Sequence, residues 1–165
     1  MTSGDLIQVG TQNIVSADGT VTASAFFELL PDYSRPVPGV SVSPGDSMTA
    51  SITRISGDQW NITITDNTNG QSNSQMVTYS SSLSSVEWIE EDPSYSDNNL
   101  IPFDYYGSTR FSNSSAATSS GAASISASGA QPIVLVNNAG QTLSIPSILT
   151  VGGGGFTVTR DNTHS

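Results

Sequence analysis

The sequence predicts an all-β fold, either a sandwich or a barrel, formed by one domain over residues 1–165. Short segments containing Val and Ile alternate with polar residues along the chain, as strands with one buried face do. Gly, Ser, Thr and Asn are abundant and mark frequent turns between these segments. No stretch has the periodicity of a long amphipathic helix. A chain of 165 residues is long enough to bury a core of its own.

In the first half of the chain, the alternation of apolar and polar residues predicts strands at 6–10, 21–30, 40–42, 47–55, 59–65 and 75–79. Residues 47–55 and 59–65 flank a short turn-forming segment, so they are predicted to form a hairpin. Gln8 alternates with two apolar neighbours in the first strand, and by periodicity alone it is an ordinary surface glutamine.

The segment 21–30 places two kinds of side chain on one face. Phe26 and Glu28 share that face, and Phe27 points to the other. A carboxylate among large apolar side chains is unfavourable unless the face lines a cleft, so we expect a cleft there. Residues 31–39 contain three prolines and are predicted to form a stiff surface loop.

Residues 86–92 combine three glutamates with Trp88 in a strand-like alternation that ends before Pro93. Polar and apolar side chains occur on both faces of the predicted strand. A strand that only builds a core would separate them, so this segment is expected to line a solvated surface. It is the first candidate for the chemistry of the chain.

The second half of the chain predicts strands at 105–111, 133–136, 142–144 and 156–159. Residues 112–129 are rich in Ser, Ala and Gly, and this composition is compatible with either a loop or strands of small residues.

Composition excludes several functions. Lys and Arg total 4 against 14 Asp and Glu, a formal charge of −10, so neither nucleic acid nor an anionic membrane is an expected partner. The chain has no cysteine, and its one histidine is His164 in the tail, which excludes a histidine-dependent triad. The first residues lack the features of a signal peptide. A hydrolase with this composition must use carboxylates and amides, and no metal or cofactor is predicted.

Several blocks, in order along the chain, resemble the glutamic peptidase (eqolisin) family. Residues 6–11 are similar to the segment around the family's catalytic glutamine, and residues 86–91 match its Ala-Glu-Trp-Ile-x-Glu block, which ends in the catalytic glutamate. Residues 25–31 resemble its Ala-Trp-Tyr-Glu-x-Tyr-Pro block, with phenylalanine and leucine replacing bulkier aromatic residues. Further similarity is found at 42–46, 65–70, 101–104 and 136–159.

The resemblance implies an antiparallel β-sandwich of two large sheets, of the concanavalin-like or jelly-roll type. It implies that Glu91 is a general base and that Gln8 is its partner on one concave face. Phe26 and Glu28 are expected to contact or support the substrate. The expected activity is that of an acid-acting, pepstatin-insensitive endopeptidase, secreted and monomeric, with polypeptide substrates and no cofactor. Relatives carry early strands before the catalytic glutamine, which this domain is expected to lack.

The residue types suit acid chemistry. A glutamate has a reference pKa of about 4.3, so it still accepts protons in mild acid, where a histidine is already protonated. A glutamine does not titrate and can donate hydrogen bonds to an oxyanion at any pH.

Two other functions are compatible with the sequence. Glu87 and Glu91 lie four apart, as carboxylates on one strand face of a β-sandwich glycosidase do, although Ile89 stands where that motif usually has an acidic residue. The polar loops would also suit a non-catalytic module that binds carbohydrate or protein.

Overall fold

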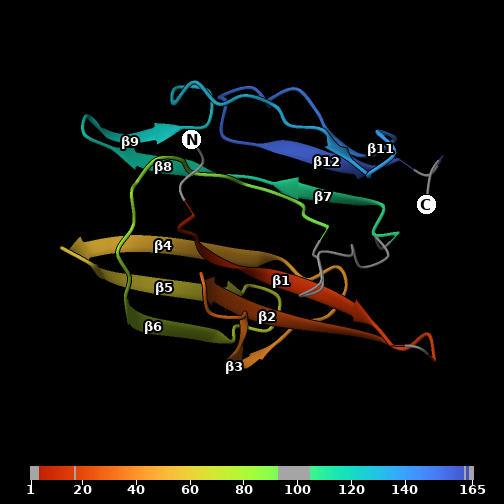
Figure 1. The fold of residues 1–165 in the computed structure, drawn as a ribbon, viewed down its shortest axis with the longest axis horizontal. Helices are drawn as coiled ribbons and strands as arrows, with labels where there is room; N and C mark the ends of the chain where they lie inside the picture. The colour runs from red at the N-terminus through yellow and green to blue at the C-terminus, as the bar shows by residue number, and fades with distance from the viewer. Residues whose placement is uncertain (1–3, 17, 93–104, 162, 164–165) are drawn as a thin grey trace. The chain divides into compact units, whose positions relative to one another are not determined.

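The structure is a computed structural model that describes residues 4–16, 18–92, 105–161 and 163. These residues form strands in antiparallel sheets (Figure 1), which confirms the predicted all-β antiparallel fold. No helix among them is long and apolar enough to cross a membrane. The chain divides into two compact units, Met1–Ser84 and Ser85–Ser165, and each is described by itself. The assignment of 1–165 to one domain stays a prediction.

The first unit contains two antiparallel sheets, each of three strands among the described residues. One has the order β1-β2-β3 and consists of β1 (Ile7–Val15), β2 (Val21–Leu29) and β3 (Arg35–Ser41). The other has the order β4-β5-β6 and consists of β4 (Met48–Ser56), β5 (Gln59–Asp66) and β6 (Ser72–Thr78). The predicted hairpin is confirmed as β4 and β5.

The core of the first unit lies between its two sheets. Ala25 and Phe27 of β2 pack in one cluster with Ile62 and Ile64 of β5, and all four are buried. The alternation along β5 is complete, because every second side chain from Trp60 to Asp66 is buried. The two sheets therefore form a β-sandwich, held together mainly by apolar burial.

The predicted loop over 31–39 is wrong from residue 35 onward, because the chain forms β3 there. Pro36 is the register partner of Phe26, and β3 lies at the edge of its sheet. An edge strand tolerates proline, since the missing N–H removes no hydrogen bond to a further strand. Val37 and Val40 supply the buried side chains that hold β3 to the core.

The second unit contains a sheet of order β10-β11-β12-β7 and a separate hairpin. The sheet consists of β7 (Ser108–Phe111), β10 (Leu135–Val136), β11 (Thr142–Pro146) and β12 (Phe156–Arg160). The hairpin pairs β8 (Ser115–Thr118) with β9 (Gly121–Ser124), so the small residues of 112–129 include strands.

The core of the second unit is built on β12. Phe156 and Val158 are buried with Ile125, and Phe111 stacks on Phe156 with ring centroids 4.8 Å apart. Trp88 packs against the same cluster from outside the sheet. This contact ties the glutamate-rich segment 86–92 to the sheet of its own unit.

Candidate active site

The β1–β2 ladder brings together three of the predicted site residues. Gln8 is directly opposite Glu28, and the next residues on the same face are Gly10 opposite Phe26. Directly paired residues of an antiparallel ladder carry their side chains on the same face. The other face of β2 carries Phe27, which is buried in the core. Gln8, Phe26 and Glu28 therefore share the face that points away from the core of the first unit.

All three of these side chains are partly buried rather than fully exposed. The ring of Phe26 lies over Gly10, because a Cβ built on Gly10 would be 3.4 Å from Phe26 Cε1. A glycine in β1 thus leaves space for the ring against the strand. Further along, the amide of Gln12 donates to the Ser24 hydroxyl at 3.2 Å. The face presents an amide, a carboxylate and an aromatic ring within a few residues, a combination suited to holding a peptide.

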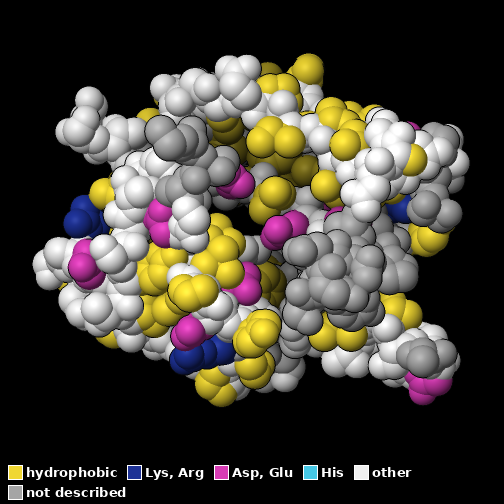
Figure 2. Space-filling view, viewed as in Figure 1, with side chains coloured by type: hydrophobic (Ala, Val, Ile, Leu, Met, Phe, Trp, Pro, Cys, Tyr) yellow, Lys and Arg dark blue, Asp and Glu magenta, His cyan; other side chains and the backbone are white. Residues whose placement is uncertain are grey.

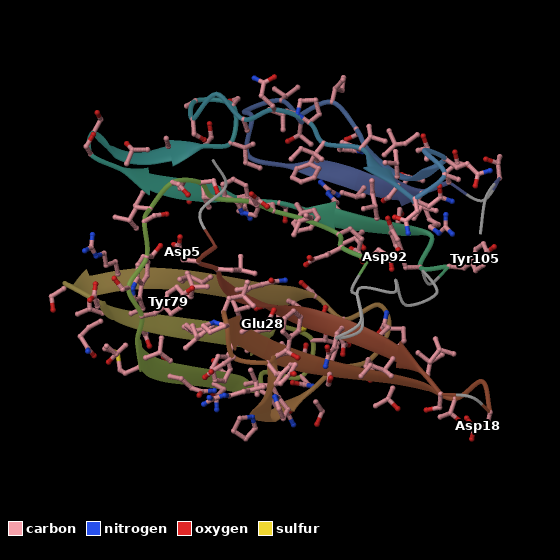
Figure 3. All side chains as sticks on the ribbon, in the orientation of Figure 1. Asp5, Asp18, Glu28, Tyr79, Asp92 and Tyr105 are labelled. Carbon is pink, nitrogen blue, oxygen red and sulfur yellow. The ribbon has the colours of Figure 1, made fainter. Side chains whose placement is uncertain are left out.

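A tyrosine that the sequence analysis did not single out closes one end of this ladder. The Tyr79 hydroxyl accepts a hydrogen bond from the Leu6 N–H at 2.7 Å and donates one to the Leu30 carbonyl at 3.0 Å (Figure 3). One signal was available, because Tyr79 shares a strand face with Val77, which packs on the core. A phenol at the end of a buried face needs a polar partner.

The segment 86–92 is not a strand, contrary to the prediction. Its mixed polarity gives it no apolar face to bury against a sheet, and Trp88 anchors it instead. Glu91 is exposed, whereas Glu90 and Asp92 are partly buried. The glycosidase alternative required Glu87 and Glu91 on one face of a strand, so it loses its structural basis.

One basic side chain of the second unit, Arg160, acts on Asp92 at the end of this segment. Arg160 is buried, its Nη1 donates to the Leu143 carbonyl at 3.0 Å, and its guanidinium lies 5.0 Å from the centre of the Tyr105 ring. Asp92 has one carboxylate oxygen that is buried without a hydrogen-bond partner in the described part of the chain. Burial raises the pKa of Asp92, Arg160 opposes this shift, and Glu91 adds to it.

Gln8, Phe26 and Glu28 belong to the first unit and Glu91 to the second, so the pairing of Gln8 with Glu91 stays a prediction. The block at 101–104 and His164 lie outside the described residues. Among the residues that are described, no group of three His, Asp or Glu side chains could hold a metal ion. On the face shown in Figure 2, acidic side chains are more numerous than basic ones, as the composition predicts.

Comparison with known proteins agrees with the resemblance seen in the sequence. The model of a family described as the Peptidase A4 family matches residues 1–160. Aspergillopepsin-2 from Aspergillus niger is 30% identical over an alignment of 148 residues that covers 86% of this chain and 49% of that protein. The chain therefore spans about half the length of the curated relative it matches.

Two solved structures share the fold. The aspergilloglutamic peptidase from Aspergillus niger is 26% identical with a TM-score of 0.82, over 95% of this chain and 90% of the other. Scytalido-glutamic peptidase, solved with a transition state analog inhibitor, is 24% identical with a TM-score of 0.75, over 96% of this chain and 77% of the other. These similarities confirm the predicted β-sandwich.

Proposed function

Because this chain belongs to the Peptidase A4 family, we propose that it is an endopeptidase of the glutamic type, active in acid on polypeptide substrates. The observation that carries the proposal is the extent of the family match. It spans residues 1–160 and so includes both the block around Gln8 and the block that ends in Glu91. We propose these two residues as the catalytic pair.

In the proposed reaction, Glu91 is the general base. Its side chain is exposed, so a water molecule can reach the carboxylate. The carboxylate takes a proton from this water as the water oxygen bonds to the carbonyl carbon of the substrate. The carbonyl π electrons move to oxygen and form a tetrahedral oxyanion. Glu91 then returns the proton to the amide nitrogen as the C–N bond breaks, so the carboxylate is regenerated.

Gln8 has the complementary role of stabilising the oxyanion. Its side-chain amide supplies N–H donors that are not lost at low pH, and its carbonyl is an acceptor for the attacking water. Glu28 lies opposite Gln8 in the ladder, where paired Cβ atoms are typically about 4.5–5.5 Å apart. Its carboxyl group is therefore close enough to orient the Gln8 amide.

Phe26 is proposed to contact a substrate side chain. It is partly buried, it lies one ladder position from Gln8 and Glu28 on the same face, and its ring packs over Gly10. An aromatic ring held against a strand gives an apolar surface for one side chain of an extended peptide. Because the ring is phenylalanine rather than a bulkier aromatic residue, we expect the enzyme to accept larger substrate side chains at this position.

We further propose that the enzyme works as a secreted monomer and is insensitive to pepstatin. One chain supplies both members of the pair, so a second copy is not needed for the chemistry. Pepstatin inhibits peptidases that use two aspartates, and the proposed pair contains a glutamate and a glutamine. An extracellular acidic medium suits a chain with 4 basic and 14 acidic residues.

The test is digestion of a denatured protein substrate from strongly acidic to neutral pH, with pepstatin present. We expect cleavage confined to acid, and reduced by about a hundredfold or more in Glu91→Gln and in Gln8→Ala. Glu90→Gln is the matched control, because it makes the same change at the neighbouring residue, and it should retain cleavage. Wild-type activity in Glu91→Gln would show that the proposed mechanism is wrong.

A further inference from the structure

The Tyr79 hydroxyl is inserted into the end of the β1–β2 ladder. The Leu30 N–H donates directly to the Leu6 carbonyl at 3.0 Å. The reciprocal bond, from the Leu6 N–H to the Leu30 carbonyl, is replaced by the two hydrogen bonds that the phenol makes. The hydroxyl thus holds the two strand ends at a spacing that a direct bond would not give.

The backbone of Tyr79 is itself fixed to the opposite sheet. Its N–H donates to the Asp58 carbonyl at 2.8 Å, and its carbonyl accepts from the indole N–H of Trp60 at 2.8 Å. Trp60 is buried in β5, so this attachment is rigid. Tyr79 therefore links the β4-β5-β6 sheet to the strands that carry Gln8 and Glu28.

A second contact supports the same end of β1. One carboxylate oxygen of Asp5 accepts a hydrogen bond from the Ser82 N–H at 2.8 Å and another from the Ser81 hydroxyl at 3.2 Å. The segment that follows β6 is thus hydrogen-bonded to two consecutive residues immediately before β1, Asp5 and Leu6. Asp5, Tyr79 and Glu28 are labelled in Figure 3.

From this geometry we propose that Tyr79 is a positioning residue that sets the placement of Gln8 and Glu28. Leu6 and Leu30 are each two residues from that pair and lie on the same strand face. Fixing the backbone at Leu6 and Leu30 therefore fixes the directions of the Gln8 side chain, two residues after Leu6, and of the Glu28 side chain, two residues before Leu30. This role rests on the proposed function, because it acts through Gln8 on the oxyanion. A shift of about 1 Å in such a group lowers rates by about a hundredfold.

The experiment compares Tyr79→Phe with Tyr33→Phe in the full chain. Tyr79→Phe removes only the hydroxyl, and Tyr33 is a matched control because its side chain is exposed. We expect Tyr79→Phe to lower kcat by about ten- to a hundredfold with KM within about twofold, since the misplaced group acts in the transition state. Tyr33→Phe should match the wild type in both constants.

Amide hydrogen exchange provides a readout that is independent of activity. In Tyr79→Phe the Leu6 amide should exchange faster, while the Phe26 amide, opposite Gly10 in the middle of the ladder, should keep its protection. Faster exchange at Leu6 with unchanged kcat would overturn the positioning role, and unchanged exchange would overturn the hydroxyl bridge. Loss of protection throughout β1 and β2 would make Tyr79 a general stability residue and would also contradict the proposal. Failure of the proposed function is recognised separately, by wild-type activity in Glu91→Gln.

Discussion

Gln8 and Glu28 are directly opposed in the β1–β2 ladder, on the face that points away from the core. Side chains at directly paired positions have Cβ atoms about 4.5–5.5 Å apart, so an amide and a carboxyl group placed there are within reach of each other. The sequence separates them by a turn and most of two strands, and only the register brings them together. If Gln8 stabilises an oxyanion, Glu28 is the nearest group on its sheet that controls which atoms of the amide face the substrate.

Replacing Glu28 by glutamine should therefore reduce catalysis without abolishing it. The new amide offers both donors and an acceptor, so the Gln8 amide is no longer held in one orientation. We expect kcat/KM to fall by about tenfold, measured on a peptide substrate at the acid optimum. Glu87→Gln, at an exposed glutamate, is the control and should be unchanged. Wild-type kcat/KM in Glu28→Gln would remove Glu28 from the site.

The adjacent residues Phe26 and Phe27 should respond in opposite ways to replacement by alanine. Phe27 is 6% exposed within the core cluster, so Phe27→Ala should lower the free energy of unfolding by about 3–5 kcal/mol. Phe26 is partly buried on the opposite face, and Phe26→Ala should cost only about 1 kcal/mol. Instead, Phe26→Ala should raise KM and change the preferred substrate side chain. Urea unfolding and a peptide-library digest measure the two effects, and equal destabilisation would contradict the assignment of faces.

The raised pKa of Asp92 predicts a pH-dependent stability effect. Because the folded chain holds this proton more tightly than the unfolded chain, the contribution of Asp92 to stability is present at low pH. It is lost as pH rises through the raised pKa. Asp92→Asn is neutral at every pH, so its thermal midpoint should exceed that of the wild type at neutral pH and equal it in strong acid. A lower midpoint at neutral pH would contradict this prediction.

Asp18 provides a control, because its pKa is shifted in the direction opposite to that of Asp92. The N–H of Thr20 donates to its carboxylate at 2.9 Å, and this hydrogen bond lowers the pKa of Asp18. Its contribution to stability is present above the ordinary pKa of an aspartate and is lost as pH falls. Asp18→Ala should therefore have a lower thermal midpoint than the wild type near neutrality and the same midpoint in strong acid.

The scarcity of basic residues predicts tolerance to acid. Protonation of the carboxylates leaves a chain whose positive charge is limited by 4 arginines, one histidine and the N-terminus, so self-repulsion stays small. The urea midpoint should change little between about pH 5 and about pH 3. Ser51→Lys and Thr53→Lys add basic charge at exposed positions of β4, and they should make the urea midpoint fall more steeply as the pH is lowered. A steep decline in the wild type would contradict this prediction.

The sequence predicted the faces of the strands better than their ends. In β2 the alternation correctly separated Phe27 from Phe26 and Glu28, because burial of one face imposes a period of two. Pro36 misled the prediction of β3, since proline excludes a central strand but is accepted at an edge. The alternation over 86–92 misled the prediction of a strand, because the partly buried Trp88 packs on the core of its unit while the segment forms no ladder.

The site was predictable only in part, for a physical reason. Alternation placed Phe26 and Glu28 on one face, whereas only the family resemblance singled out Gln8. The role of Tyr79 could not be predicted, because it depends on a hydrogen bond between sheets, over a separation of 73 residues to Leu6. Such contacts follow from how two sheets pack, and no local pattern encodes that packing.

The central claim is that Gln8 and Glu91 act as one unit, and a double-mutant cycle tests it most directly. The measurement is kcat/KM for Gln8→Ala, Glu91→Gln and the double variant on one peptide at the acid optimum. Residues that act together give strongly non-additive losses. We predict that the double variant is no less active than Glu91→Gln alone. A loss equal to the product of the two single losses would show that the residues act independently and would contradict the account.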